Sequence, residues 1–401
     1  MKIRYRVSII AILTIIFLVI TPLLILWTLG YRYNSKKHSI EKTGLLIVKS
    51  EPNNADIYLN NKKQKNQSPA KIKYLLSGDY DFKLEKQGYF SFDKKIAVKS
   101  GEATFADNVI LLKQNLPVLL NGGEIKALEI SLNGEKAALV QNEKNKTQIN
   151  IFDLKNETTQ KIYETEIIYL NPQITWLNND EILIYDPSNS NKPPITILIR
   201  EPQAANIITV EKNAVLARYY YIKEDAVYYI KDNALFARSL PDGLENKILE
   251  IQYRNYIPYF IGDYWVLKNI SNNKLLVLNQ KKEIVFDGDG EKAIFGKIDG
   301  EFIVHDGFEM NIYNAEKKER NFVTRSSSKI NGALFFDDTN YIIYALGGDI
   351  YAAEKPQNGA ESAIIRLAQF SEIYSLLSDA TNLYILGKIN DKMGIYKMNL
   401  R

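Results

Sequence analysis

The chain begins with one long apolar segment and continues with a body in which short apolar stretches alternate with polar turns. The segment from Val7 to Leu29 contains no charged residue. About 20 apolar residues, at ~1.5 Å per residue in a helix, are enough to cross a hydrocarbon layer of roughly 30 Å. No later stretch repeats this pattern. The sequence therefore predicts one transmembrane helix followed by a large polar body.

A cleaved secretory signal is the alternative interpretation of this segment, because basic residues precede the apolar run in both cases. The run is longer than the usual signal core of ~7–15 residues, and no small-x-small cleavage site follows it. Trp27, Tyr31 and Tyr33 are suited to an aromatic belt at the membrane surface. These features favour an uncleaved anchor.

The orientation of the anchor does not follow from charge, because basic residues flank the apolar run on both sides. Long polar domains translocate largely regardless of flanking charge, and the head before Val7 is very short. We therefore expect a single-pass protein of the cell membrane. Its head is predicted to stay in the cytoplasm and its C-terminal body to be extracytoplasmic.

Behind the anchor (residues 1–30), residues 31–42 form a polar connector that is expected to act as a linker. The pattern then changes to short apolar stretches, several alternating with period two and separated by turn residues. Six strands are predicted, at residues 45–48, 55–59, 70–74, 80–84, 94–98 and 103–111. Strands and turns without helical periodicity indicate a small β-sandwich over residues 43–112.

The turns of this segment carry a family resemblance. Four motifs follow one another: Pro52-Asn-Asn-Ala55, Ser68-Pro69, Gly78-Asp-Tyr80 and Gly88-Tyr89. In this order they resemble the PEGA domain, a family named after a Pro-Glu-Gly-Ala turn. Asn54 and Asn66 stand where the family has glycine, and asparagine tolerates a left-handed backbone better than other residues with a β-carbon. The resemblance implies a structural or carbohydrate-associated spacer on a bacterial or archaeal surface protein, without catalytic residues.

From residue 113 to residue 401 a unit of about 40 residues repeats, which is the spacing of propeller blades. In each unit a turn-forming residue precedes a strongly apolar strand. These residues are Gly134, Asp180, Asp225, Asp263, Asp299, Asn340 and Asn382. The units resemble the degenerate WD40-like or TolB-type repeat and predict a seven-bladed β-propeller. Two tandem β-sandwiches are the alternative, since short strands with regular turns also build sandwiches.

The two ends of the repeat region complement each other. The last unit lacks residues for a fourth, outermost strand, and residues 116–120 precede the first unit without a partner there. We expect these residues to complete the last blade. This pairing would close the ring and hide its sheet edges. The fold class is therefore all-β, apart from the N-terminal helix.

Composition excludes several kinds of chemistry. The chain has no cysteine, which excludes disulfides and thiolate sites, and its net charge of +4 comes from interspersed residues rather than a basic stripe. No nucleic-acid partner is therefore predicted. Of the two histidines, His38 lies in the linker and His305 in an expected turn between strands, and a lone histidine without an oriented nucleophile is no catalytic triad. We predict no enzymatic activity, no catalytic residue and no cofactor.

Two local patterns are candidates for binding. The segment Asp287-Gly-Asp-Gly-Glu291 offers carboxylates to calcium but is too short for an EF-hand loop, so a turn between blades is favoured and no metal is predicted. Tyr253, Arg254 and Tyr256 form the candidate binding surface, because aromatic rings stack well on sugars and peptides. Tyrosines packed between blades are the alternative, because tyrosine favours strands.

Together these observations predict a membrane-anchored protein whose propeller binds a protein or a cell-envelope polymer such as a polysaccharide, with the PEGA-like domain as a spacer. Two alternatives stay open. One is an envelope enzyme acting on glycans or peptides through paired carboxylates on the propeller. The other is a purely structural surface spacer.

Overall fold

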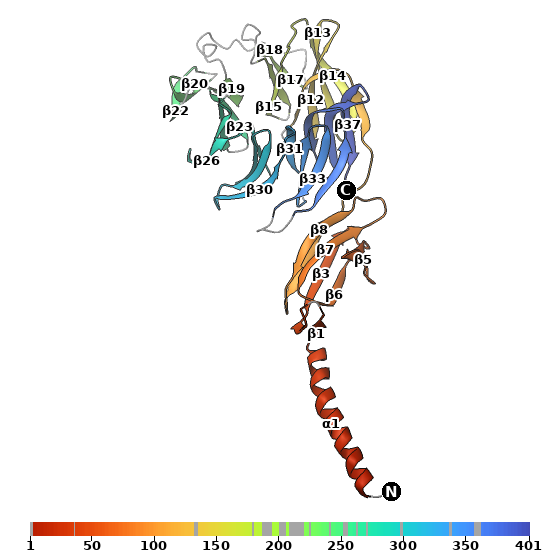
Figure 1. Ribbon diagram of the computed structural model, residues 1–401. Coiled ribbons are helices and arrows are strands. Elements are labelled where there is room, and N and C mark those ends of the chain that lie inside the picture. The colour runs from red at the N-terminus through yellow and green to blue at the C-terminus, as the bar shows by residue number, and fades with distance from the viewer. Residues whose placement is uncertain are drawn as a thin grey trace. The chain divides into compact units, whose positions relative to one another are not determined.

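The chain forms two compact units, Met1–Gln114 with Pro356–Ile365, and Asn115–Lys355 with Arg366–Arg401. Figure 1 shows the N-terminal helix and sandwich in red and orange, and the remaining sheets from yellow to blue. The computed structural model describes residues 3–35, 37–131, 135–178, 180–186, 195–199, 206–207, 220–223, 226–239, 242–251, 256–261, 264–269, 272–296, 300–336, 339–356 and 362–401.

The first unit starts with the helix α1 (Ile3–Thr28). Its stretch Ile9–Thr28 has a mean hydropathy of 3.1, and none of it is buried against protein. The helix is therefore long and apolar enough to cross a membrane, a property that an N-terminal signal sequence shares. Pro22 lies inside the helix, as is common for helices in membranes.

The segment expected to be a plain linker forms a two-stranded hairpin, β1 (Tyr31–Asn34) and β2 (Ser39–Lys42). His38 has a positive φ of 52° in the turn between the two strands. The Asn34 side chain donates a hydrogen bond of 3.1 Å to the carboxylate of Glu41, which holds the two strands together. The connector is thus an ordered element in its own right.

The next segment is a two-layer β-sandwich, as predicted from its alternating pattern. One sheet has the strand order β6 (Ala70–Leu75), β3 (Gly44–Glu51), β9 (Ala103–Ile110). The other has the order β5 (Lys62–Lys63), β4 (Asp56–Leu59), β7 (Gly78–Glu85), β8 (Phe92–Val98). Alternate side chains of β3, among them Leu46 and Val48, are buried, as are Ile57, Phe82 and Leu84 of the other sheet. The period-two pattern is the consequence of this one-sided burial.

The turn between β3 and β4 has a left-handed backbone at Asn54, the position where the PEGA family has glycine. Asn54 has a φ of 64°, in the left-handed region, whereas Asn66 is not among the residues with positive φ. The explanation by a tolerated left-handed asparagine therefore applies to Asn54 and is not needed at Asn66. The buried hydroxyl of Ser68 fixes this turn, since it accepts a 3.0 Å hydrogen bond from the amide of Ala55 and lies 2.5 Å from the hydroxyl of Ser50.

After the sandwich, the described residues form seven four-stranded sheets. The first has β11 (Ile125–Ile130), β12 (Lys136–Glu143), β13 (Lys146–Asp153) and β14 (Thr158–Thr165), and the second has β15 (Gln173–Asn178), β16 (Glu181–Tyr185), β17 (Ile195–Leu198) and β18 (Asn206–Ile207). The third has β19 (Tyr220–Lys223), β20 (Ala226–Lys231), β21 (Ala234–Ser239) and β22 (Glu245–Glu250), and the fourth has β23 (Tyr256–Ile261), β24 (Tyr264–Asn269), β25 (Lys274–Leu278) and β26 (Ile284–Asp289).

The fifth has β27 (Lys292–Phe295), β28 (Glu301–His305), β29 (Glu309–Asn314) and β30 (Glu319–Arg325), and the sixth has β31 (Ile330–Phe336), β32 (Tyr341–Leu346), β33 (Asp349–Glu354) and β34 (Ile364–Gln369). The seventh has β35 (Glu372–Ser378), β36 (Asn382–Ile389), β37 (Lys392–Asn399) and β10 (Val118–Gly122). Successive four-stranded sheets are the architecture of a β-propeller, not of two sandwiches. The count of seven blades stays a prediction, because residues 187–194, 200–205 and 208–219 lie outside the described residues.

The predicted turn residues can be checked at three positions. Asp180 and Asn340 directly precede β16 and β32, and Asn382 is the first residue of β36, so each lies where the chain enters a second strand. The other four, Gly134, Asp225, Asp263 and Asp299, lie outside the described residues.

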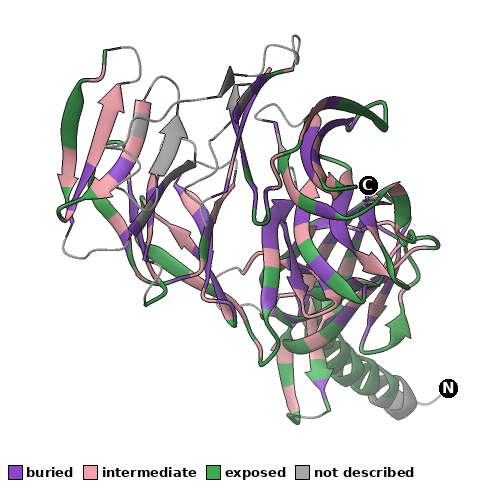
Figure 2. Cartoon of the chain, turned by 90° about the horizontal axis from the view of Figure 1, so that it is seen from above, coloured by how far each residue is buried: buried purple, intermediate pink, exposed green. Residues whose placement is uncertain are grey.

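Burial falls from the inside to the outside of each sheet. The second strands are almost continuously buried, as in β12, β32 and β36. The fourth strands are mostly exposed, as in β14, β22 and β30. In Figure 2 the buried residues accordingly follow the middle of the sheets, and exposed residues gather on outer strands and connections. The first strands of several neighbouring sheets contact one another, β11 with β15, β27 with β31 and β31 with β35. They therefore form the inner side of the propeller.

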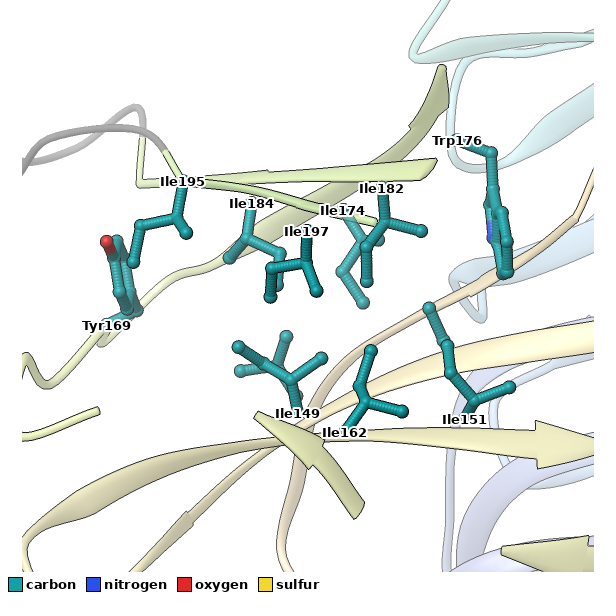
Figure 3. Close-up of a cluster of buried hydrophobic side chains, with 12 residues drawn as sticks. Ile149, Ile151, Ile162, Tyr169, Ile174, Trp176, Ile182, Ile184, Ile195 and Ile197 are labelled. Atoms are coloured by element: carbon teal, nitrogen blue, oxygen red, sulfur yellow. The ribbon is translucent and has the colours of Figure 1, made fainter. Parts of the chain in front are cut away.

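Apolar clusters lie between successive sheets. Figure 3 shows the cluster between the first and second sheets, where Ile149, Ile151 and Ile162 face Ile182, Ile184 and neighbouring isoleucines. Burying one such side chain contributes about 1.5–3 kcal/mol relative to leaving it exposed. Similar clusters join the third to the fourth, the fourth to the fifth and the fifth to the sixth sheets. Interlocking of branched apolar side chains thus holds the sheets face to face.

The predicted pairing of the two ends of the repeat region is confirmed. Strand β10 pairs with β37 in an antiparallel register that runs from Val118↔Lys397 to Gly122↔Gly394, two residues later along the chain than the predicted segment 116–120. Tyr384 and Leu386 of the last sheet pack in one cluster with Phe152 of the first. The side chain of Asn121 also donates a hydrogen bond of 2.9 Å to the Thr159 hydroxyl of the first sheet. In Figure 1 β37 accordingly lies beside β12 and β14.

Candidate functional site

A cavity of about 420 Å³ opens where the first strands of the fifth, sixth and seventh sheets begin. Residues from four sheets line it. Its charged or titratable lining residues are Lys268 of β24, Glu291, Lys292 of β27, His305 of β28 and Lys329. Segments 330–333 of β31 and 373–376 of β35 complete the wall. A volume of this size is typical of sites for small molecules or for a side chain of a partner.

The cavity is predominantly basic, because three lysines face one glutamate. Lys329 forms an ion pair of 3.0 Å with Glu291. Lys268 and Lys292 form no ion pair with a described residue. Partial burial lowers the pKa of Lys268, repulsion from Lys329 and Lys292 lowers it further, and the carboxylate of Glu291 partly offsets both effects. The lysines thus hold positive charge together without full compensation.

His305 lies in the wall of this cavity and is 4% exposed. Among the described residues, its two ring nitrogens are the buried side-chain polar atoms that lack a hydrogen-bond partner. Burial lowers the pKa of His305 to about 4, so its ring is neutral at physiological pH. A buried polar group without a partner costs about 1–3 kcal/mol, so this arrangement needs an explanation.

The expectation that His305 lies in a turn is wrong. His305 is the last residue of β28, paired with Lys292 on one side and Met310 on the other. Its backbone carbonyl accepts a 2.7 Å hydrogen bond from the amide of Glu291. The turn begins one residue later, where the carboxylate of Asp306 accepts hydrogen bonds from two following amides. The sequence His-Asp-Gly places the turn correctly but not its first residue.

A second acidic group lies on the inner side of the propeller. Glu129, on β11, keeps part of its surface exposed. The pKa of its carboxyl is nevertheless raised to about 7, because the surrounding protein disfavours the charged form, and the positive charge of Lys292 partly offsets the shift. The backbone carbonyl of Glu129 accepts a 3.1 Å hydrogen bond from the indole of Trp176 on β15. Charges from the first and fifth sheets therefore influence each other across the inner strands.

The structure describes one of the three residues predicted to bind a partner. Tyr253 and Arg254 lie outside the described residues, and their role stays a prediction. Tyr256 opens β23 and is 5% exposed, in a cluster with Leu235 and Leu267. This burial favours the packing alternative for Tyr256, because a ring in the core has little surface to offer a ligand.

The acidic segment considered for calcium is mostly strand. Asp287 and Asp289 belong to β26, and Asp289 forms an ion pair of 3.1 Å with Lys274 on the neighbouring strand. Gly290 and Glu291 then connect this sheet to the next, as the predicted turn between blades requires. Within the described ranges, no group of three or more His, Cys, Asp or Glu residues is placed to hold a metal ion.

A second cavity of about 420 Å³ lies between the fourth and fifth sheets and is lined by Asn279, Lys281, Glu283 and neighbouring residues. There the amide of Asn279 donates a 2.8 Å hydrogen bond to Glu283, within one turn. No described residue of this cavity has a buried polar atom that lacks a partner. The basic cavity is therefore the stronger candidate site.

The basic cavity could not be read from a sequence motif, because its residues come from separate repeats. A weak signal exists in the repeat itself. Lys292 opens β27, and Lys329 directly precedes β31, so a lysine recurs at the start of two consecutive first strands. Lys268 comes from a second strand and follows no such rule.

Comparison with known proteins supports both parts of this description. Residues 43–111 match the model of the PEGA domain, which confirms the resemblance found in the turns. No curated protein matches the sequence.

Several solved structures are similar in fold. A chain from a crystal structure of the mitotic checkpoint complex has a TM-score of 0.51 at 10% identity, with 71% of this chain and 92% of that chain covered. The β-propeller domain of Cps50 (Swd1) from Myceliophteria thermophila has a TM-score of 0.48 at 9% identity, covering 71% and 99%. Hsv2 from Kluyveromyces lactis has a TM-score of 0.46 at 10% identity, covering 66% and 90%. At such identities the likeness concerns the fold alone. Residues 43–111 are therefore similar to the PEGA domain, and the following sheets have the fold of a β-propeller.

Proposed function

We propose that this chain is a single-pass membrane protein whose β-propeller binds a protein or a cell-envelope polymer outside the cytoplasm. In this proposal residues 1–30 form the cytoplasmic head and the anchor, residues 31–42 connect it, and residues 43–112 form a PEGA-like spacer. Residues 113–401 form the binding propeller. The basic cavity is the observation that carries the binding role, because its buried histidine has two polar atoms without a partner.

The anchor in this proposal is supported by α1. The apolar side chains of Ile9–Thr28 are not buried by the described part of the protein, and burying them in a bilayer is strongly favourable. A cleaved signal remains the competing interpretation. Protease added to intact cells should remove the body, residues 43–401. Cleavage that occurs only after the membrane is permeabilised would mean that the body lies in the cytoplasm. A mature protein that begins near residue 30 would identify α1 as a cleaved signal.

A binding role rather than catalysis is supported by the residue types on the propeller. The chain has no cysteine, and His305 has no nucleophile or carboxylate hydrogen-bonded to it among the described residues. A binding site without turnover needs only complementary charge and shape, which the cavity offers.

The binding role is tested with the full chain in detergent or nanodiscs. Immobilised protein is incubated with envelope polysaccharides and, separately, with solubilised membrane proteins, and retained material is analysed for products. We expect retention without cleavage. Time-dependent cleavage of a glycan or peptide would favour the enzyme alternative, and a protein that retains nothing would favour the structural spacer.

A further inference from the structure

The basic cavity has the chemistry of an anion site. Lys292 and His305 are register partners on β27 and β28, so their side chains project from the same face of the fifth sheet with β-carbons about 5 Å apart. Lys268 reaches the same cavity from the fourth sheet and Lys329 from the segment before the sixth. Lysines from two sheets and from the segment before a third therefore line one cavity with a buried ring that has unused hydrogen-bonding atoms.

The nearby acidic groups are engaged with partners other than Lys268 and Lys292. Glu291 is already paired with Lys329. Asp306 accepts hydrogen bonds from the backbone amides of its own turn. On the side of β35, the carboxylate of Glu372 is bonded to the hydroxyl of Tyr374. The high pKa of Glu129 keeps it partly protonated at neutral pH. Among the described residues, Lys268 and Lys292 thus form no ion pair with an acidic side chain.

We propose that this cavity binds an anionic oxygen group, a carboxylate or a phosphate, of the propeller's partner. A neutral His305 donates the hydrogen of one ring nitrogen to an anionic oxygen, and Lys268 and Lys292 supply the opposing charge. The bound oxygen gives the N–H of the buried ring an acceptor, and the charge of the anion relieves the repulsion among the lysines. This inference rests on the proposed binding function, for which it names the ligand class.

The chain offers a direct probe of this site, because it contains two histidines and one of them is in the linker hairpin. Histidine labelled with carbon-13 gives two ring signals in the full chain in nanodiscs, and His38→Gln assigns them. The labelled protein is titrated separately with inorganic phosphate and with succinate, and with neutral succinamide as a control. We expect a saturable shift of the His305 signal with one or both anions and none with succinamide. The more effective anion identifies the source as phosphate or carboxylate.

Two substitutions test the geometry. Lys268→Gln together with Lys292→Gln should weaken anion binding at least about 10-fold, since the double variant removes two charge-assisted contacts to the anion. The matched control is Lys317→Gln, an exposed lysine in the turn between β29 and β30 and outside the cavity, which should leave the affinity unchanged. Both kinds of variant replace solvent-accessible side chains, and unchanged melting shows that the fold is intact.

The proposal is overturned if the His305 signal does not respond to either anion, or if Lys317→Gln weakens binding as much as the double variant. It is distinguishable from the binding function itself. Suppose that the native protein and the double variant retain envelope material equally and that neither anion shifts the His305 signal. The proposed anion site is then wrong, and the binding role stands. If His305 responds to an anion but no envelope material is retained, the site stands and the proposed partner class is wrong.

Discussion

The guanidinium of Arg32 lies 3.7 Å from the ring centre of Trp27 and donates a hydrogen bond of 2.8 Å to the carbonyl oxygen of the same residue. It also lies 4.4 Å from the ring centre of Tyr74, in β6 of the sandwich. One cation thus joins the end of α1, the hairpin and the PEGA-like sheet. Carbonyl groups at the end of a helix lack partners within the helix, and Arg32 supplies one.

Removing this contact should loosen the junction. In Arg32→Ala the carbonyl of Trp27 keeps the amide of Gly30 as a donor but loses the guanidinium, and two rings lose their shared cation. Each lost contact contributes about 0.5–1 kcal/mol at an exposed site. We expect faster hydrogen exchange in residues 29–34 with little change in the melting of the propeller. Lys73→Ala, an exposed charge next to Tyr74, is the control. Equal exchange in the two variants would show that Arg32 does not order the junction.

Closure of the propeller makes a second prediction at Gly394, which pairs with Gly122 of β10. A β-carbon at Gly394 would collide with the carbonyl oxygen of Asn121 and lie 2.6 Å from a methyl group of Leu119. Gly394→Ala should therefore push β10 off β37 and destabilise the protein by about 1–3 kcal/mol, as overpacking does.

The control for closure is Gly332→Ala, because a β-carbon at Gly332 has its nearest neighbour at 3.7 Å. Chemical denaturation gives the stability of each variant, and hydrogen exchange of residues 392–399 locates the change. Gly394→Ala with the stability and exchange of Gly332→Ala would mean that the β10 pairing contributes little. Deleting residues 118–122 should produce the same local loss in a stronger form.

Some of these contacts could be predicted from the sequence, and others could not. The pairing of β10 with β37 was predictable, because a repeat short of one strand and an unpaired strand elsewhere imply each other. The alternation in β3 gives its buried face directly. By contrast, the meeting of Lys268, Lys292 and Lys329 depends on the angle between sheets, which no local pattern encodes. The burial of Tyr256 depends on register in the same way, since tyrosine is common on both faces of strands.

The lowered pKa of His305 predicts acid sensitivity. Between its ordinary value of 6.5 and its native value of about 4, the unfolded chain binds a proton at this position and the native protein does not. Stability therefore falls as the pH falls through this range, by about 3 kcal/mol in full, since one pKa unit corresponds to about 1.4 kcal/mol. His305→Gln should lose less stability between pH 6.5 and 4 than the native protein. Parallel stability curves for the two proteins would contradict the buried neutral ring.

The raised pKa of Glu129 predicts the opposite trend. Between its ordinary value of 4.5 and about 7, the native protein holds a proton that the unfolded chain has released. Stability should therefore rise from this group as the pH falls from 7 to 4.5. Glu129→Gln removes that gain, so its loss of stability on acidification should be steeper than that of the native protein. Denaturant unfolding at a series of pH values measures the slope, and a slope equal to that of the native protein would show that Glu129 titrates as in water.

Substitutions at Tyr256 distinguish a role in packing from a role in binding. Its buried ring packs against Leu235, Leu267 and Leu276, so Tyr256→Ala should leave a cavity and cost roughly 3–5 kcal/mol, by analogy with other large aromatic residues. Tyr256→Phe keeps the ring and should restore most of the lost stability. Tyr253→Ala with Arg254→Ala, if these residues form the predicted contact, should instead weaken retention of envelope material with melting nearly unchanged. Should Tyr256→Ala melt like the native protein, the ring would not be packed, and a binding role for Tyr256 would regain support.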